Sequence, residues 1–201
     1  MRRSDLEGKK LLVMGGIQLS CEIIRKAQEM GIFVAVADYN KVEDSPGKQI
    51  ADQAFQVSTT DVDAMVELVR KEKFDGIITG FVDLLLPYYA EICEKTGLPA
   101  YGTKEQFNTY INKAEYKKLC RQHHVPTVEE YRIDLDAFDE TTTGIKYPVM
   151  VKPADSSGSR GITVCYCKDE LKTALEKARA YSKVGSILVE QYLTGREVTV
   201  F

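Results

Sequence analysis

A lysine inside an apolar run is the first feature of this sequence that could do chemistry. The stretch VMVKPADSSGSRGITVCY, residues 149–166, places Lys152 in a segment typical of a strand. A cation held there needs either a route to water or an anion as its partner. The loop that follows offers an anion site, because its glycines permit positive φ while serine hydroxyls and backbone N–H groups can surround phosphate oxygens. The candidate phosphate site comprises Lys152, Ser156, Ser157, Gly158, Ser159, Arg160 and Gly161.

A second lysine, Lys113, falls in the first turn of a helix predicted over residues 111–125. Asn112 is the expected N-cap, and Glu115 stands at the capping-box position. A cation here opposes the positive end of the helix dipole at a cost of about 0.3 kcal/mol, which a bound anion would reverse. The alternative for both lysines is a solvated side chain without a ligand, with Lys152 beside a flexible hairpin loop.

The stretch LVEQYLTGREVTVF, residues 188–201, contains two strand signals separated by a turn at Thr194 and Gly195. Extended backbone here could present C=O and N–H groups to the edge of a flat heteroaromatic ring, while a following glutamate accepts hydrogen bonds from sugar hydroxyls. A plain hairpin with carboxylates facing solvent is the alternative. The candidate residues are Glu190, Gln191, Tyr192, Leu193 and Glu197.

The elements of the first half alternate short apolar runs with longer amphipathic ones. This pattern is typical of parallel strands joined by crossover helices. Gly31 ends the first helix, and Pro87 lies in the first turn of the last one. Strands are predicted over residues 10–16, 32–38, 52–57, 76–80 and 98–102, and helices over 20–31, 60–73 and 83–97.

The pattern changes after residue 105. Strands are predicted over residues 127–133, 147–153, 161–166 and 186–192, with one helix over 169–182, which indicates an α+β arrangement. We therefore predict a first domain over residues 1–105, a helical linker over 106–125 and a second domain over 126–201. The last residues still carry a strand signal, so we expect the sequence to be a fragment of a longer protein.

The order of these parts resembles the ATP-grasp superfamily. A helical lysine is followed by a strand lysine with its glycine loop, then by VEQYL and a glutamate seven residues past Glu190, and the resemblance extends from Lys9 to Phe201. It implies an α/β protein in which an N-terminal Rossmann-like parallel-sheet pre-ATP-grasp domain precedes an incomplete α+β ATP-grasp nucleotide-binding subdomain. The implied cofactors are ATP and Mg²⁺, with the metal ligands expected beyond residue 201 and none in this chain.

The resemblance also assigns roles to residues. Lys113 and Lys152 match the two lysines that hold the α- and β-phosphates, and residues 156–161 match the mobile loop that closes over the β- and γ-phosphates. Such groups suit phosphoryl transfer, which depends on positioning and charge stabilisation. Adenine contacts, made largely through the backbone, are implied for Glu190, Gln191 and Leu193, and a ribose contact for Glu197.

Polar residues and glycines of the first domain lie at or just past the predicted strand ends, where open α/β sheets bind ligands. In ATP-grasp enzymes the turn after the first strand faces the second substrate, so the resemblance implies acceptor contacts there. The glycine pair of this turn also suggests a dinucleotide site, but it lacks the G-x-G-x-x-G pattern. The candidate acceptor-binding residues are Gly15, Gly16, Gln18, Asp38, Thr79, Gly80 and Asp83.

The implied activity is that of an ATP-dependent carboxylate-amine or bicarbonate ligase, similar to carbamoyl-phosphate synthase, biotin carboxylase and phosphoribosylglycinamide synthetase. In that chemistry a carboxylate attacks ATP to form an acyl phosphate, and an amine then displaces phosphate. The implied partners are small-molecule carboxylates and amines, and homodimers are frequent among such enzymes. The fragment alone is expected to be inactive. The alternatives are a nucleotide-binding regulatory module without catalysis and a Rossmann-type NAD(P)-dependent oxidoreductase.

The composition indicates which classes of protein and partner are not expected. With 44% hydrophobic residues, 28% charged residues and a net charge of -3, the sequence gives no reason to expect nucleic-acid binding. Its five cysteines lack C-x-x-C spacing, which argues against a disulfide framework and a zinc site. Apolar runs stay well short of the roughly 18 residues of a membrane span. We therefore expect a cytoplasmic protein with neither a membrane nor a nucleic-acid partner.

Overall fold

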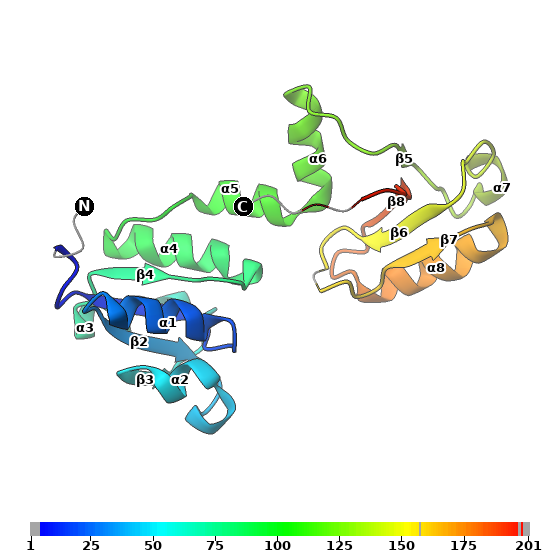
Figure 1. Cartoon of the computed structure of the whole chain (residues 1–201). Helices are drawn as coiled ribbons and strands as arrows, with labels where there is room; N and C mark the ends of the chain where they lie inside the picture. The colour runs from blue at the N-terminus through cyan, green and yellow to red at the C-terminus, as the bar shows by residue number, and fades with distance from the viewer. Residues whose placement is uncertain (1–4, 157, 197, 199–201) are drawn as a thin grey trace. The chain divides into compact units, whose positions relative to one another are not determined.

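The computed structural model describes residues 5–156, 158–196 and 198 of the chain. Two of the predicted site residues, Ser157 and Glu197, lie outside the described residues. The chain divides into two compact units, the first ending at Asn108 and the second beginning at Thr109 (Figure 1). The predicted domain division at residues 105 and 125 stays a prediction.

The first unit is built on a four-stranded parallel sheet with the order β3-β2-β1-β4. Strands and helices alternate along the chain, as the sequence pattern predicts. The strands are β1 (Lys10–Met14), β2 (Phe33–Asp38), β3 (Gln53–Gln56) and β4 (Gly76–Ile78). The helices are α1 (Ser20–Glu29), α2 (Pro46–Ile50), α3 (Val62–Glu72) and α4 (Leu86–Thr96), with short 3-10 helices η2 (Val42–Asp44) and η3 (Asp83–Leu85). Helix α5 (Lys104–Ile111) begins in the first unit and ends in the second.

Both faces of this sheet are covered by helices. Leu12 of β1 belongs to a buried cluster with Met65 of α3 and Tyr89 of α4. Val13, the next residue along β1, belongs to a separate cluster with Ile24 of α1. Successive side chains of a strand point to opposite faces, so each face of the sheet has its own core. This doubly covered parallel sheet confirms the predicted Rossmann-like class of the first half.

The strand predicted over residues 98–102 is wrong, because these residues form no strand in the structure. Pro99 has no N–H to donate to a ladder. The backbone N–H of Tyr101 donates to the hydroxyl of Tyr89 at 3.3 Å, and the Tyr101 hydroxyl donates to the Thr79 carbonyl at 2.8 Å. The segment therefore packs through its aromatic side chain rather than through strand pairing.

The second unit contains an antiparallel sheet with the order β5-β8-β6-β7. Its strands are β5 (Glu130–Tyr131), β6 (Val149–Pro153), β7 (Thr163–Cys165) and β8 (Ile187–Gln191). Its helices are α6 (Lys113–Gln122), α7 (Phe138–Thr141) and α8 (Lys168–Tyr181), and α8 runs along one face of the sheet (Figure 1). The arrangement confirms the predicted α+β class of the second half.

The core of this unit lies between the sheet and α8. Val149, Val151 and Val189 pack there with Leu171 and Leu175 of α8. The register pairs Met150 with Glu190 and Lys152 with Leu188, so these alternate residues point to the opposite face. That opposite face is where the charged side chains gather.

The N-terminus of α6 has the cap that the sequence predicts. The Asn112 side chain accepts hydrogen bonds from the backbone N–H groups of Ala114 and Glu115, so the predicted N-cap is confirmed. The strand predicted over residues 127–133 is shorter in the structure, where Glu130 and Tyr131 pair with β8 and the Glu129 carbonyl accepts from the Gln191 N–H.

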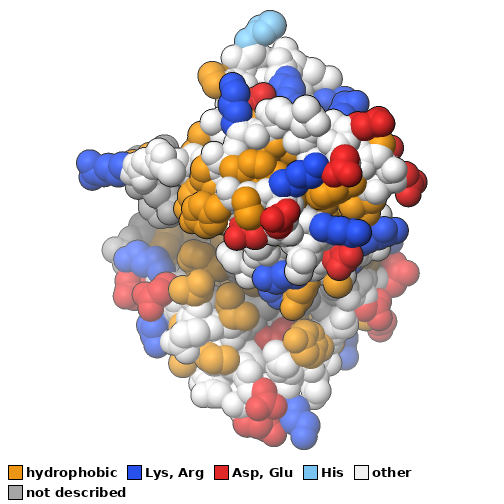
Figure 2. Space-filling model, turned by 90° about the vertical axis from the view of Figure 1, so that its right-hand side faces the viewer, with side chains coloured by type: hydrophobic (Ala, Val, Ile, Leu, Met, Phe, Trp, Pro, Cys, Tyr) orange, Lys and Arg blue, Asp and Glu red, His pale blue; other side chains and the backbone are white. Residues whose placement is uncertain are grey.

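The described surface mixes both signs of charge. On the face shown in Figure 2, Lys and Arg side chains are interspersed with Asp and Glu side chains. Among the described residues, every helix is too short or too polar to cross a membrane.

Candidate functional site

The first turn of α6 and the end of β6 meet at the start of the glycine-rich loop. The Lys113 ammonium donates to the Ser156 carbonyl at 2.5 Å and to the Ala154 carbonyl at 3.4 Å. Burial lowers the pKa of Lys113, and the nearby Lys152 ammonium lowers it further. Two cations that repel each other in a partly desolvated place favour an anion between them. The structure therefore brings together the two lysines that the sequence singled out.

The backbone amides at the start of α6 already have partners. The Lys113 N–H donates to the Ala154 carbonyl at 3.4 Å, and the Asn112 side chain accepts from Ala114 at 3.0 Å and Glu115 at 3.2 Å. An anion that approaches this end of the helix would thus meet the Lys113 ammonium rather than unpaired helix amides.

Glu190 is the centre of a charged cluster on the sheet face opposite α8. Its side chain is only 5% exposed, and its two oxygens contact different cations. Lys152 Nζ lies 2.6 Å from Glu190 Oε2, and Lys117 Nζ lies 2.7 Å from Glu190 Oε1. Lys117 also contacts Glu130 Oε1 at 2.9 Å, and Arg121 contacts the other oxygen of Glu130. Cations and carboxylates therefore alternate from α6 across the sheet.

Lys117 was missed by the sequence reasoning. It lies four residues after Lys113 on the same helix, and residues at this spacing share one helix face. That spacing is a signal that could have identified it. The carboxylates it contacts could not be paired with it in the same way, because they belong to strands, and helix spacing carries no information on contacts with another element.

The glycine-rich loop has the backbone conformations that its composition predicts. Gly158 and Gly161 have φ values of +67° and +77°, and Ser159 also lies in the left-handed region at +58°. A Cβ at Gly161 would lie 2.8 Å from the Tyr181 Cβ and 2.9 Å from the Pro153 Cγ. Only glycine therefore fits at this position.

One end of this loop is anchored. The Asp155 carboxylate accepts hydrogen bonds from the Ser182 hydroxyl at 2.6 Å, from Lys183 N–H at 2.9 Å and from Val184 N–H at 3.2 Å. These bonds, led by that from Ser182, lower the pKa of Asp155. The tip differs, since Gly158, Ser159 and Arg160 are all exposed. An anchored base with an exposed tip suits a loop that covers a ligand.

A cavity of about 680 Å³ adjoins Glu190. Residues 190–196, which include the predicted adenine contacts, contribute most of its lining, and Met150 supplies an apolar wall. The backbone N–H groups of Gln191 and Tyr192 donate to the carbonyls of Glu129 and Pro148, each at 3.0 Å. These two amides hold the segment in place, while the 64% exposed Leu193 follows them. The lining comprises Val128, Met150, Glu190, Gln191, Tyr192, Leu193, Thr194, Gly195 and Arg196.

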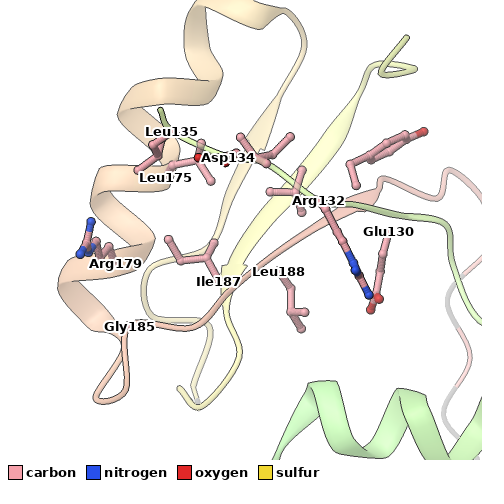
Figure 3. Close-up of a pocket in the computed structure, with 12 residues that line it drawn as sticks. Glu130, Arg132, Asp134, Leu135, Leu175, Arg179, Gly185, Ile187 and Leu188 are labelled. Carbon is pink, nitrogen blue, oxygen red and sulfur yellow. The ribbon is translucent and has the colours of Figure 1, made fainter. Parts of the chain in front are cut away.

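A second cavity in this unit, of about 600 Å³, lies between residues 130–135, α8 and β8 (Figure 3). Leu175 and Arg179 approach it from α8, and Ile187 and Leu188 from β8. Among the described residues, its lining includes none of the predicted site residues. We assign it no ligand.

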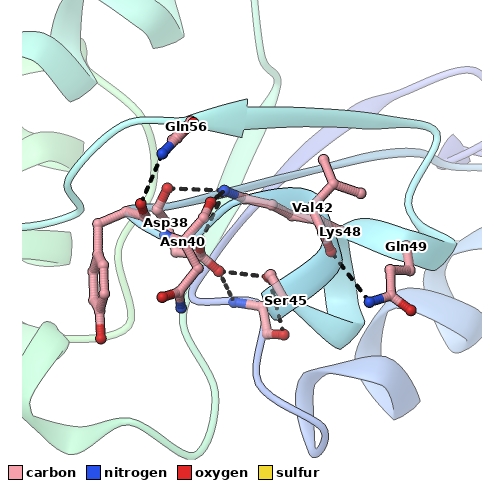
Figure 4. Close-up of polar contacts among 9 residues, drawn as sticks. Asp38, Asn40, Val42, Ser45, Lys48, Gln49 and Gln56 are labelled. Carbon is pink, nitrogen blue, oxygen red and sulfur yellow. Dashed lines mark hydrogen bonds and ion pairs between the residues drawn. The ribbon is translucent and has the colours of Figure 1, made fainter.

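In the first unit, Asp38 at the end of β2 is fully engaged within the protein (Figure 4). One oxygen accepts from Gly16 N–H at 2.9 Å and from the Ser45 hydroxyl at 2.7 Å. The other lies 2.9 Å from Lys48 Nζ and accepts from Asn40 N–H at 2.8 Å. Burial raises the pKa of Asp38, but the bonds from Lys48, Ser45 and Gly16 outweigh it and lower the pKa below its ordinary value.

These contacts give Asp38 and Gly16 internal roles. A Cβ at Gly16 would lie 2.2 Å from the Ser45 Oγ and 2.9 Å from Asp38 Oδ2, so the turn requires glycine. An Asp38 carboxylate with this many partners has little capacity left for ribose hydroxyls, which weighs against a dinucleotide site. Its contact with an acceptor substrate stays a prediction.

The other candidates of the first unit follow the ends of β1 and β4. Gly15 has a φ of +90°, and the buried Thr79 donates its hydroxyl to the Met14 carbonyl at 3.2 Å. Gln18 and Asp83 are exposed, and Gly80 is half-buried against Ile23. Because parallel strands end at the same sheet edge, these residues share one edge of the sheet. Their contact with a substrate also stays a prediction.

Comparison with known proteins identifies a matching family and several relatives. Residues 108–201 match the family described as the D-ala D-ala ligase C-terminus. Formate-dependent phosphoribosylglycinamide formyltransferase from Sulfurisphaera tokodaii is 29% identical over 197 residues, covering 96% of this chain and 49% of that protein. The 2-oxoglutarate carboxylase small subunit from Hydrogenobacter thermophilus is 28% identical, covering 92% of this chain and 42% of that protein.

Solved structures share the fold. The biotin carboxylase domain dimer of H. thermophilus 2-oxoglutarate carboxylase, in complex with MgADP, ADP and bicarbonate, superposes with a TM-score of 0.75 at 27% identity. It covers 92% of this chain and 44% of that chain. An ADP complex of N5-carboxyaminoimidazole ribonucleotide synthetase gives a TM-score of 0.77 at 22% identity, covering 94% of this chain and 48% of that chain.

Residues 108–201 match an ATP-grasp ligase domain, and over nearly its whole length the chain is similar to ATP-grasp ligases. The two units, the lysine pair with its glycine-rich loop and the adjoining cavity agree with this assignment. The chain spans about half the length of the curated relatives it matches, 49% of the first and 42% of the second.

Proposed function

We propose that the protein is an ATP-dependent ligase that joins a small-molecule carboxylate, or bicarbonate, to an amine. The carboxylate oxygen attacks the γ-phosphorus of ATP, and the bond to the β-phosphate oxygen breaks to release ADP. The amine nitrogen then attacks the acyl carbon, phosphate leaves and the amine loses a proton. A cytoplasmic location and a homodimer accompany this proposal, and both remain to be tested.

The convergence of Lys113 and Lys152 at the start of the glycine-rich loop carries the proposal, and Glu190, the ion-pair partner of Lys152, lines the cavity of about 680 Å³. Phosphoryl transfer needs groups that position phosphates and neutralise their charge. The two ammonium groups supply that charge, and N–H groups of the exposed loop tip supply donors that can approach phosphate oxygens. The segment after Glu190 would receive the base in the cavity.

Magnesium belongs to the chemistry of this superfamily, but the described residues do not fit a metal site. They hold no group of three His, Cys, Asp or Glu side chains placed around a common point. We therefore derive no step through a metal from this chain. The location of the magnesium ligands beyond residue 201 stays a prediction.

Calorimetric titration of the full-length protein with ADP, and separately with NADH, tests the proposal. We expect ADP to bind and NADH to give no heat. Lys152→Met should weaken ADP binding by roughly tenfold to a hundredfold, because a hydrogen bond to a charged group contributes roughly 1.5–3 kcal/mol. Lys168→Met, which removes an exposed ion pair with Asp139, is the matched control and should leave the affinity unchanged.

Binding of NADH without binding of ADP would overturn the proposal in favour of an oxidoreductase with its site at Gly15, Gly16 and Asp38. An ADP affinity unchanged by Lys152→Met would remove the lysine from the site. Phosphate release from ATP in the presence of a panel of carboxylates and amines then separates a ligase from a regulatory module, because a module binds nucleotide without turnover.

A further inference from the structure

Lys117 lies outside every role assigned so far, although its side chain is only 12% exposed and contacts two carboxylates. We propose that Lys117 is a positioning residue for nucleotide binding. It keeps the buried Glu190 carboxylate neutralised, so that Lys152 can exchange Glu190 for a phosphate of the nucleotide. This inference rests on the proposed function.

Glu190 shares its charge between two cations. Lys152 lies 2.6 Å from one oxygen and Lys117 lies 2.7 Å from the other. When Lys152 turns to a phosphate, Glu190 loses one of its two partners inside the protein. A buried carboxylate without any cation is strongly unfavourable, so the exchange depends on a second cation that stays.

The charged cluster around Glu190 carries a net positive charge. Lys117, Lys152 and Arg121 supply three positive charges, and Glu130 and Glu190 supply two negative charges. The ion-paired cluster thus has one positive charge more than it needs for its own neutrality. Without Lys117 that excess disappears, and among the described residues Lys152 is left as the cation in an ion pair with Glu190. Lys152 would then be held against its carboxylate instead of being available to a phosphate.

The place of Lys117 on α6 lets it reach two strands. Its contacts with Glu130 of β5 and Glu190 of β8 fix it from two strands. Lys113 begins the same helix one turn earlier and reaches the glycine-rich loop. Helix α6 therefore carries two residues that serve the nucleotide. Lys113 is a predicted phosphate-binding lysine, and Lys117 makes Lys152, the other such lysine, available to a phosphate.

The test compares ADP with adenosine, which lacks phosphates, by calorimetric titration of the full-length protein. We expect Lys117→Met to weaken ADP binding about tenfold, a coupling typical of residues in one charged network. Adenosine binding should change by less than about twofold, because no phosphate competes for Lys152. Lys117→Arg should restore most of the ADP affinity. Lys118→Met, on the exposed face of the same helix, should leave it unchanged.

A second variant separates positioning from structural damage. Glu190→Gln removes the negative charge that Lys117 neutralises, so Lys117→Met added to it should cost little further ADP affinity. This comparison holds even where Lys117→Met alone fails to fold, because the double variant buries no unpaired carboxylate at residue 190. Equal weakening of ADP and adenosine, or a full loss that persists in the double variant, would overturn the inference.

The proposed function and this inference fail in different ways. If the wild-type protein does not bind ADP, the proposed function is wrong. If ADP binds and Lys152→Met weakens it, while Lys117→Met has no effect, the function stands and only the role of Lys117 is wrong.

Discussion

The ammonium of Lys113 loses hydration and faces a second cation. Burial lowers its pKa below the ordinary value of 10.5, and Lys152 lowers it further, whereas Asp155 and Glu190 act in the opposite direction. A bound polyphosphate adds negative charge next to the ammonium and therefore raises its pKa. The protonation of Lys113 and nucleotide binding are thus linked.

We predict that ADP affinity falls as the pH rises through the Lys113 pKa of the free protein. Below that pKa the ammonium is already charged, and between the free and bound values binding must take up a proton. Calorimetry in two buffers of different ionisation enthalpy, at alkaline pH below 10.5, measures this uptake. Lys113→Met should abolish it, and identical binding heats in both buffers for the wild type would contradict the prediction.

At the scale of elements, a buried ion pair joins the end of β2 to α2. Lys48 is 1% exposed and Asp38 7% exposed in their side chains, with 2.9 Å between Nζ and Oδ1. Lys48 also donates to the carbonyls of Asp38 and Asn40. The Gly47 N–H donates to the Gly16 carbonyl at 2.8 Å, so the same segment holds the glycine turn after β1.

We predict that Lys48→Met lowers the free energy of unfolding by about 3–5 kcal/mol, because it leaves a buried carboxylate without its cation. Urea unfolding followed by far-ultraviolet circular dichroism measures this change. Lys26→Met is the control, since it removes an exposed ion pair with Glu29 and should cost less than about 1 kcal/mol. Equal losses of unfolding free energy in the two variants would contradict the prediction, because the buried Lys48–Asp38 pair would then stabilise the fold no more than the exposed Lys26–Glu29 pair.

At the scale of the whole molecule, the carboxylates with lowered pKa values set the response to acid. Burial raises the pKa of Glu130, but the Lys117 ammonium and the Arg121 guanidinium beside it outweigh burial and lower the pKa, as Lys48 does for Asp38. The Ser182 bond lowers that of Asp155. Each such group stabilises the fold above its unfolded-state pKa, and this contribution is lost as the pH falls through the folded-state value.

We therefore predict that the melting temperature falls as the pH drops below the ordinary values of 4.5 for Glu130 and 3.8 for Asp38. Thermal unfolding followed by circular dichroism across this range measures the loss. Asp38→Asn should lower the melting temperature near neutral pH and flatten its fall in acid. A melting temperature that stays constant or rises on acidification would contradict the linkage.

Local patterns in the sequence determined the fold class of both units, most strands and helices, the cap at Asn112 and the two lysines with their glycine-rich loop. These features could be predicted because periods of two and 3.6 residues, capping residues and glycine conformations depend on neighbours in the chain. The prediction over residues 98–102 failed because tertiary packing of Tyr101 replaced strand pairing there.

Only the tertiary structure decided which charges meet. Glu190 lies 73 positions after Lys117 and 38 after Lys152, and the β6–β8 register together with the placement of α6 brings the three side chains into contact. The partners of Asp38 likewise come from separate places in the chain, the glycine turn after β1 and the start of α2. Sequence spacing carries no information on such contacts, because they depend on strand register, and a shift of one residue would send Glu190 to the other face of the sheet.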